Sequence, residues 1–291
     1  MGTDPRTARR NAVLAGLDGT ALAAVLPDLR ETALSSGVVL HEAGQPIQEV
    51  HFPLVGVVSV VADLGADQVV ETATVGREGM VGIAVFLDSG VPTEQALVQV
   101  PGEALTMSAE ALRRHLTDVD GALTSMLRRS ANALFTQLSR NAACNRLHTV
   151  RQRAARWLLM TADRMDSPSF ELTQHFLAQM LAVRRTSVSE VAQSLAEDGC
   201  ITYQRSWLPL SGRSHRRGQR SAMATSERVT WETSPSCGRL AAFAWRDGPL
   251  FALDCPGGCR LSGGDFGRRA PTFCNFPPAG ARRPTGADAQ A

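Results

Sequence analysis

The hydrophobic positions of this chain follow a strand-like pattern in its first third. Short runs rich in valine are separated by glycine, proline and aspartate at spacings of about 8–12 residues, and they cover residues 38–44, 50–64, 69–76, 79–87 and 95–107. Several short strands at regular spacing are typical of an all-β barrel or sandwich. We therefore predict a β domain, either a ligand-binding cup or a purely structural module.

A helical pattern follows, from about residue 118 to 164, after a short helix that Ser108 can cap. Within the long stretch, apolar residues are spaced four, three and four apart, as in a coiled-coil seam, at Leu127, Ala131, Leu134 and Leu138. We expect this helix to pair with a second copy of the chain, because an isolated long helix would leave an apolar stripe exposed. The alternative is a helix that packs on its own β domain.

Residues 171–196 carry two apolar stripes that are out of phase. The first consists of Phe176, Leu177, Met180 and Leu181, and the second of Val188, Val191, Ala192 and Leu195. Two arginines lie between them, where a single stripe would have to continue, so we predict two helices joined by a turn. Thr173 is the expected cap of the first helix, and the second should begin near Arg185 and end at Asp198–Gly199.

Two short helices joined by a tight turn form the helix-turn-helix, whose second helix lies in the major groove of DNA. The first polar residues of that helix can all pair with base edges: Arg185, Thr186, Ser187, Ser189 and Glu190. Arg185 can bind guanine through two hydrogen bonds. An ordinary pair of amphipathic helices in an α-helical domain is the alternative.

Three segments resemble the Crp/Fnr family of bacterial transcription regulators. They are GREGMVGIAVFL at 76–87, NRLHTVRQRAARWLLMTADRM at 145–165 and LTQHFLAQMLAVRRTSVSEVAQSLAEDGCITY at 172–203. The resemblance implies an α+β fold with an N-terminal β-roll (jelly-roll-like) sensor domain over residues 12–117, a dimerisation helix over 118–144 and a winged helix-turn-helix over 145–205. It also implies a homodimer that reads a palindromic operator in double-stranded DNA, with recognition helices roughly 34 Å apart. RNA polymerase is a further partner that it suggests.

The family's DNA-reading residues carry over to this chain position by position. Arg185 matches the first base-reading arginine, and Ser187 and Ser189 match small hydroxyl positions at the groove. Thr186 replaces a residue that is usually acidic, and Glu190 replaces an arginine, so the operators of other members should not be assumed. Contacts with phosphates are expected from three further residues: Thr173, Gln174 and Arg184.

The ligand of the sensor domain is not predicted by the resemblance. Members that bind cyclic nucleotides hold the phosphate with an arginine followed by serine or threonine, where this chain has Thr93-Glu94-Gln95-Ala96. An acid in that place repels the phosphate, which argues against cyclic AMP. The N-terminal cysteine cluster of the iron–sulfur members is missing as well. We predict no cofactor or metal, and the four isolated histidines His41, His51, His115 and His148 are more often plain polar groups than ligands.

Composition excludes several other classes of protein. The net charge is +2 and the chain contains no lysine. No apolar run approaches the roughly 18–20 residues of a membrane span, and the N-terminus is not a signal peptide, so we expect a cytoplasmic protein without a membrane partner. No nucleophile elbow, phosphate loop, HExxH or paired-carboxylate motif is present, which argues against an enzyme. A sensor or dimerisation protein that has lost DNA binding is the alternative function.

Residues 206–291 lose the periodicity of the preceding chain and become rich in arginine, glycine and proline. Such composition predicts an irregular or disordered tail in place of the family's wing strands. Our hypothesis is that a shifted reading frame produced the tail, and the nucleotide sequence would test it. A genuine extension is the alternative, with a weak possibility of zinc binding by Cys237, Cys255, Cys259 and Cys274.

Overall fold

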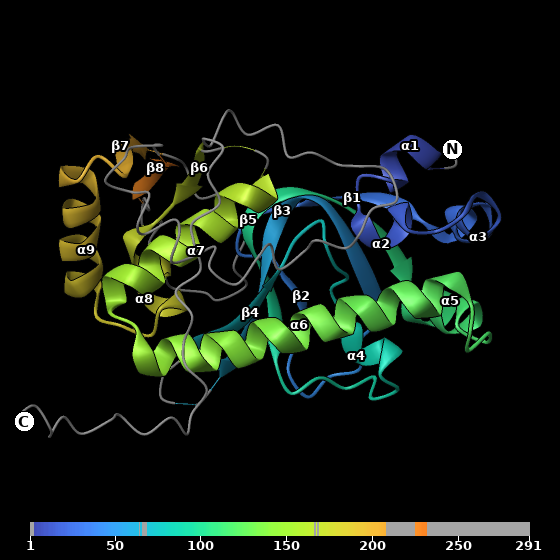
Figure 1. Cartoon of the computed structure of the whole chain (residues 1–291). Helices are drawn as coiled ribbons and strands as arrows, with labels where there is room; N and C mark the ends of the chain where they lie inside the picture. Colours follow the sequence, from blue (N-terminus) through green and yellow to red (C-terminus); the bar gives the residue numbers. More distant parts are fainter. Residues whose placement is uncertain are drawn as a thin grey trace, which may run out of the picture. The chain divides into compact units, whose positions relative to one another are not determined.

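Short helices at the N-terminus precede the main sheet in this computed structural model (Figure 1). They are α1 (Pro5–Ala8), α2 (Ala12–Ala15) and α3 (Gly19–Val25), followed by the 3-10 turn η1 (Leu26–Asp28). The structure describes residues 3–63, 65, 69–165, 167, 169–207 and 225–231, all of which lie in the compact unit Met1–Asp254. Asn11 caps α2 and also donates to the carbonyl oxygens of Pro53 and Gly79, which anchors these helices to the sheet.

The predicted β domain is confirmed as a five-stranded antiparallel sheet. Its strands are β1 (Arg30–Leu34), β2 (Val39–His41), β3 (Glu49–Asp63), β4 (Val69–Val75) and β5 (Gln95–Ser108), in the order β1-β5-β3-β4 with β2 also on β5. The sequence of β1, RETAL, does not alternate apolar and polar residues and therefore did not predict a strand. In the structure only Leu34 of its five residues is buried.

The prediction of a strand over residues 79–87 is wrong. Val81 makes a single bridge to His51, and the chain then turns at Gly82, whose φ is +91°. The helix α4 (Ile83–Phe86) follows and buries Val85. Gly82 ends the pairing because its left-handed backbone, which favours glycine, cannot continue a strand.

The two faces of the main sheet pack against different parts of the chain. Val58 and Val98 lie in one core cluster with Leu34 and Val81. Val57 and Val61 point the other way, as neighbours on a strand must, and pack with the helix α7 (Val150–Met165) and the helix-turn-helix. The main sheet and the C-terminal helices therefore share one hydrophobic core.

The long helical stretch predicted over 118–164 is two helices. After α5 (Ala109–His115), which Ser108 caps as predicted, α6 (Ala122–Leu147) ends at His148 and α7 begins at Val150. The break has a local cause, because Thr149 and Gln152 form a reciprocal capping box. The Gln152 amide donates to Thr149 Oγ1 (3.3 Å), and the Thr149 amide donates to Gln152 Oε1 (3.0 Å). This signature is readable in the sequence.

The prediction of a largely irregular tail over residues 206–291 misses one strand. The strand β8 (Thr225–Trp231) pairs antiparallel with both β6 (Ser169–Leu172) and β7 (Ile201–Trp207). Its sequence TSERVTW opens with four polar residues and has apolar residues only at Val229 and Trp231, and Val229 is buried against the helix-turn-helix. The hypothesis of a shifted reading frame stays a prediction, and the four cysteines of the zinc alternative lie outside the described residues.

Candidate nucleic-acid interface

Two helices meet at a tight turn where the sequence predicts them. α8 (Gln174–Met180) begins at Thr173, whose Oγ1 accepts from the Phe176 amide at 3.1 Å. Four residues separate the end of α8 from α9 (Arg185–Glu197), which ends before Gly199, a residue with a φ of +65°. Ala182 has a φ of +51° in the turn, a backbone position that L residues other than glycine rarely adopt. The predicted bend near Ala182 is confirmed.

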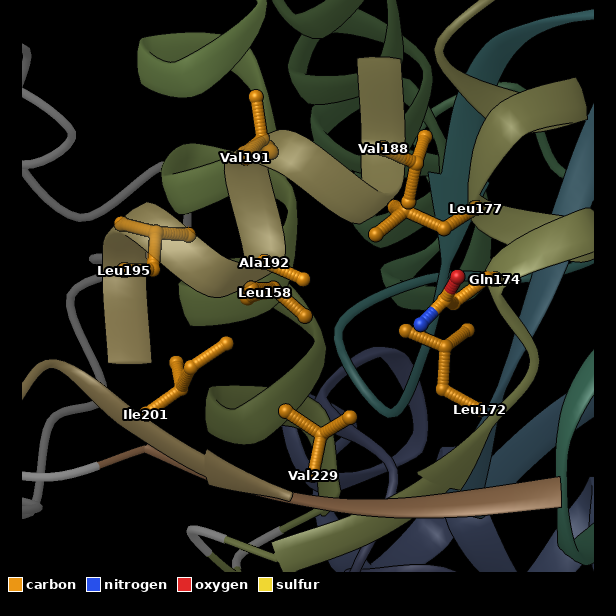
Figure 2. Close-up of a pocket in the computed structure, with 11 residues that line it drawn as sticks. Leu158, Leu172, Gln174, Leu177, Val188, Val191, Ala192, Leu195, Ile201 and Val229 are labelled. Carbon is orange, nitrogen blue, oxygen red and sulfur yellow. The ribbon is translucent and has the colours of Figure 1, made fainter. Parts of the chain in front are cut away.

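The residues on the buried face of this helix pair, where it lines a small gap, are all apolar except Gln174. Figure 2 shows Val188 and Leu195 of α9 pointing toward Leu158 of α7 and Leu177 of α8, with Val229 of β8 closing the opposite side. The gap that remains among these side chains is about 20 Å³. A space of this size holds one water molecule at most, so it is a packing gap rather than a ligand site.

The opposite face of α9 is open and begins with two arginines. Among the predicted contact residues, those at the surface are Arg184, Arg185, Thr186, Ser189 and Glu190, while Ser187 is half-buried. Arg184 is the N-cap and makes no side-chain capping bond. The start of α9, the positive end of the helix dipole, therefore carries two exposed guanidinium groups, an arrangement that attracts phosphate.

Two of the predicted DNA-contacting side chains bind each other. Ser189 Oγ donates to Gln174 Oε1 at 2.7 Å and lies 3.2 Å from the Arg185 carbonyl oxygen. Thr173 and Gln174 are half-buried at the start of α8, next to α9. The structure thus gathers Thr173, Gln174 and Ser189 on one side of the helix pair, and their contacts with DNA stay predictions.

Two exposed residues on later turns of α9 were missed in the sequence. Gln193 and Glu197 are exposed, and Gln193 Nε2 donates to Glu197 Oε1 at 2.8 Å. Gln193 follows Ser189 by four residues, the spacing of one helix face, and this was the signal available. The exposed face of α9 is thus basic at its start and acidic farther along, at Glu190 and Glu197. The basic first turn is the part of this face that favours close approach to phosphates.

The surface of α6 differs from the predicted seam. Leu127 is fully buried in its own domain and Leu134 is half-buried there, whereas Phe135 (68% exposed) and Leu138 (38% exposed) face outward. The exposed apolar stripe is therefore rotated from the predicted one, because the sheet covers one side of the same helix. Phe135 was not predicted as part of it.

Comparison with known proteins finds similarity in the helix-turn-helix domain and in the overall fold. The family model "Crp-like helix-turn-helix domain" matches residues 152–209. The fold is similar to the c-di-GMP responsive global regulator CLP of Xanthomonas campestris, with a TM-score of 0.53, 16% identity and coverage of 74% of this chain and 100% of that one. Residues 152–209 thus match a Crp-like helix-turn-helix domain, and the fold of the chain is similar to that of solved Crp/Fnr regulators.

Two other solved structures have the same Crp/Fnr fold. FixK2 from Bradyrhizobium japonicum has a TM-score of 0.54 and 15% identity, with coverage of 74% of this chain and 96% of that one. A CRP-family transcriptional regulator from Thermus thermophilus has a TM-score of 0.52 and 17% identity, with coverage of 76% and 98%. No curated sequence matches the chain.

Buried polar contacts join the Crp-like domain to the main sheet and to the turn that follows β4. Trp157 Nε1 of α7 donates to Glu71 Oε1 of β4 at 2.9 Å, and Arg164 Nε donates to Glu78 Oε1 at 2.8 Å. Burial raises the pKa of Glu71 to about 7, although hydrogen bonds from Ser59 and Trp157 and the charge of Arg164 oppose the shift. Burial also lowers the pKa of Arg153.

Within the described ranges, no three or more His, Cys, Asp or Glu side chains gather to hold a metal ion. His51 lies with Nδ1 at 2.9 Å from Thr106 Oγ1, and burial lowers its pKa to about 4. It is a hydrogen-bonded core residue. In the same part of the chain, no helix combines the length and the apolar character that crossing a membrane requires.

Proposed function

We propose that this protein is a homodimeric, cytoplasmic DNA-binding regulator of transcription that responds to a signal through its β-roll domain. The observation that carries the proposal is the exposed start of α9, where Arg184 and Arg185 project from a helix whose other face is buried. A helix held in this way can enter the major groove, and Arg185 can pair with guanine there. Thr186, Ser187, Ser189 and Glu190 are the further base-reading candidates.

The exposed stripe of α6 supports the homodimer. A phenylalanine that is 68% exposed costs free energy in water, and a second copy of the same helix can cover it together with Leu138. A two-fold interface of this kind presents two copies of α9, which suits a palindromic operator.

The signal in this proposal is not cyclic AMP. The interior cluster of the β-roll is built from small apolar side chains, including Val58, Val98 and Ala96, which offer no group for a phosphate. Glu94 adds a negative charge near His41 and raises its pKa, although burial of His41 has the larger effect and lowers it. An anionic nucleotide gains nothing from such surroundings.

The test is a DNA-binding titration with an operator selected from random sequences. Arg185→Ala should weaken binding to that operator by about 1–3 kcal/mol, which is about 5- to 150-fold, and should relax the preference at one base position. Arg113→Ala removes the same charge from an exposed site on α5 and should leave affinity unchanged. Equal effects of the two variants would contradict base reading by Arg185.

Salt dependence separates this function from the alternative. Retention of the intact chain on DNA should fall steeply as salt rises, because bound phosphates release counterions. If the folded dimer shows no such retention, the protein is a sensor or dimerisation protein without DNA binding. The β8 strand argues against that alternative, since it completes the three-stranded sheet beside the helix-turn-helix.

A further inference from the structure

A buried chain of polar side chains crosses from the sensor sheet to α7. Glu71 on β4 accepts from Trp157 Nε1 through Oε1 and contacts Ser59 Oγ through Oε2 at 2.7 Å. Ser59 Oγ also lies 2.7 Å from Gln99 Oε1. Gln99 Nε2 then reaches Thr161 Oγ1 of α7 at 3.4 Å. Three strands of the sensor and one helix of the DNA-binding domain therefore share one polar network.

The hydrogen-bonding groups of this network suit a neutral Glu71 when the Gln99 nitrogen faces Thr161. The Ser59 hydroxyl has one hydrogen, but its oxygen lies 2.7 Å from two acceptor oxygens, Glu71 Oε2 and Gln99 Oε1. The Gln99 amide turns its nitrogen toward Thr161, so it supplies no hydrogen to Ser59. A neutral Glu71 provides the missing hydrogen through its own hydroxyl. The geometry thus favours the protonated acid.

The charged groups around Glu71 offset a negative charge there only in part, since the charge of Arg164 lowers the pKa of Glu71 less than burial raises it. Arg164 of α7 is already paired with Glu78 at 2.8 Å. Arg153 and Arg156 of α7 and Cys144 of α6 line the polar cavity that Glu71 shares, which measures about 50 Å³. Arg153 is engaged with the Leu181 carbonyl oxygen, and Arg156 has an interaction of its own. Ionisation would place a carboxylate beside Trp157 without a close cation of its own.

The same cavity gives protons and water a place beside the carboxyl group. A volume of about 50 Å³ is enough for a few water molecules, since about 10–15 Å³ holds one. Its other lining residues come from the sensor (Thr74), from α6 (Gln137, Asn141) and from the end of α8 (Met180, Leu181). Water that hydrates an ionised Glu71 would therefore enter a cavity lined jointly by the β domain, α6 and the end of α8.

We propose that Glu71 is a proton-operated latch that holds α7 against the sensor sheet when neutral and releases it when ionised. This rests on the proposed function, because the elements that the latch holds carry α9. A buried carboxylate without a paired cation is costly, and the cost is relieved when α7 moves away and water reaches the charge. Proton uptake would then set how firmly the DNA-binding helices are attached to the sensor.

The decisive experiment follows Trp157 in the intact chain, because its indole touches the carboxyl group. Fluorescence is titrated from about pH 5 to 8.5, and subtraction of a Trp157→Phe titration isolates the Trp157 signal. The wild type should show an inflection near pH 7, where the carboxyl loses its proton. Glu71→Gln is neutral and of the same shape, so its signal should stay flat. Glu31→Gln, an exposed control on β1, should behave like the wild type.

Infrared spectroscopy provides a second readout that does not depend on tryptophan. The carbonyl band of a protonated carboxylic acid should be present in the wild type at pH 6, disappear by pH 8 and be missing from Glu71→Gln at both values. A wild type without an inflection, or a Glu71→Gln variant with the same inflection and band, would overturn the latch. If Glu71→Gln does not fold, the wild-type infrared titration decides.

DNA binding is measured last, so that the two proposals can fail separately. The ratio of operator affinities at pH 6 and pH 8 should differ at least about threefold between wild type and Glu71→Gln, and Glu31→Gln should match the wild type. Identical ratios would show that the latch does not control DNA binding. Loss of operator binding at every pH would contradict the proposed function, while the fluorescence and infrared results would still decide the latch.

Discussion

The buried ion pair between Arg164 and Glu78 gives the sharpest test of how α7 is attached to the sensor. The Arg164 side chain is only 3% exposed and that of Glu78 only 9%. Arg164 Nε donates to Glu78 Oε1 at 2.8 Å, and its other nitrogens donate to the Thr74 and Met160 carbonyl oxygens. Glu78 Oε1 also accepts from the Gly76 amide. Both charges are therefore desolvated and held by several hydrogen bonds.

Removing one partner of this ion pair should lower the free energy of unfolding by far more than the intact pair contributes to it. Arg164→Met keeps an unbranched apolar stem but leaves the Glu78 carboxylate buried without its cation, which typically costs about 3–5 kcal/mol. Adding Glu78→Gln removes the unpaired charge. The double variant should then recover about 2 kcal/mol relative to Arg164→Met alone, because a buried pair replaced by neutral groups is often close to neutral in stability.

Urea unfolding at pH 7 measures these differences, provided that the m-values agree among the variants. Arg114→Met serves as the control, because Arg114 forms exposed ion pairs with Asp28 and Glu110 that are worth less than about 1 kcal/mol. A loss below about 1 kcal/mol for Arg164→Met, or strictly additive effects in the double variant, would refute the reasoning that the sensor and α7 are joined by a desolvated ion pair.

Three further predictions concern the turn, the dimer and the effect of pH on stability. Ala182→Gly should raise the free energy of unfolding by about 0.5 kcal/mol, because the relief of left-handed strain exceeds the extra chain entropy that glycine loses on folding. A lower free energy of unfolding than that of the wild type, measured by urea titration, would contradict this. Phe135→Ala should weaken dimerisation by about 2 kcal/mol, or roughly 30-fold in sedimentation measurements, whereas Val119→Ala, also exposed but outside α6, should not. The stability contributed by Glu71 is greatest below its unfolded pKa of 4.5 and should fall by about 3 kcal/mol as pH rises to about 7; the same pH dependence in Glu71→Gln would argue against it.

The local patterns of the chain were sufficient to predict the helix-turn-helix. Thr173, the charged interruption at residues 182–185 and Gly199 are read directly as a cap, a turn and a stop, because each acts within a few residues of its own position. The capping box at Thr149 and Gln152 was equally local and was overlooked. The strand β8 was missed because its own sequence is mostly polar and it lies in a stretch rich in arginine, glycine and proline.

The contacts between distant segments were decided only by the tertiary structure. Periodicity shows that Leu127 and Leu138 lie near one face of a helix, but the position of the sheet determines that Leu127 is buried while Phe135 and Leu138 are exposed. In the same way, nothing in the sequence near Glu71 indicates that Trp157, 86 residues away, donates to its carboxyl group. Burial and pKa depend on what packs against a side chain from elsewhere in the chain, whereas caps, turns and helix faces depend on its immediate neighbours.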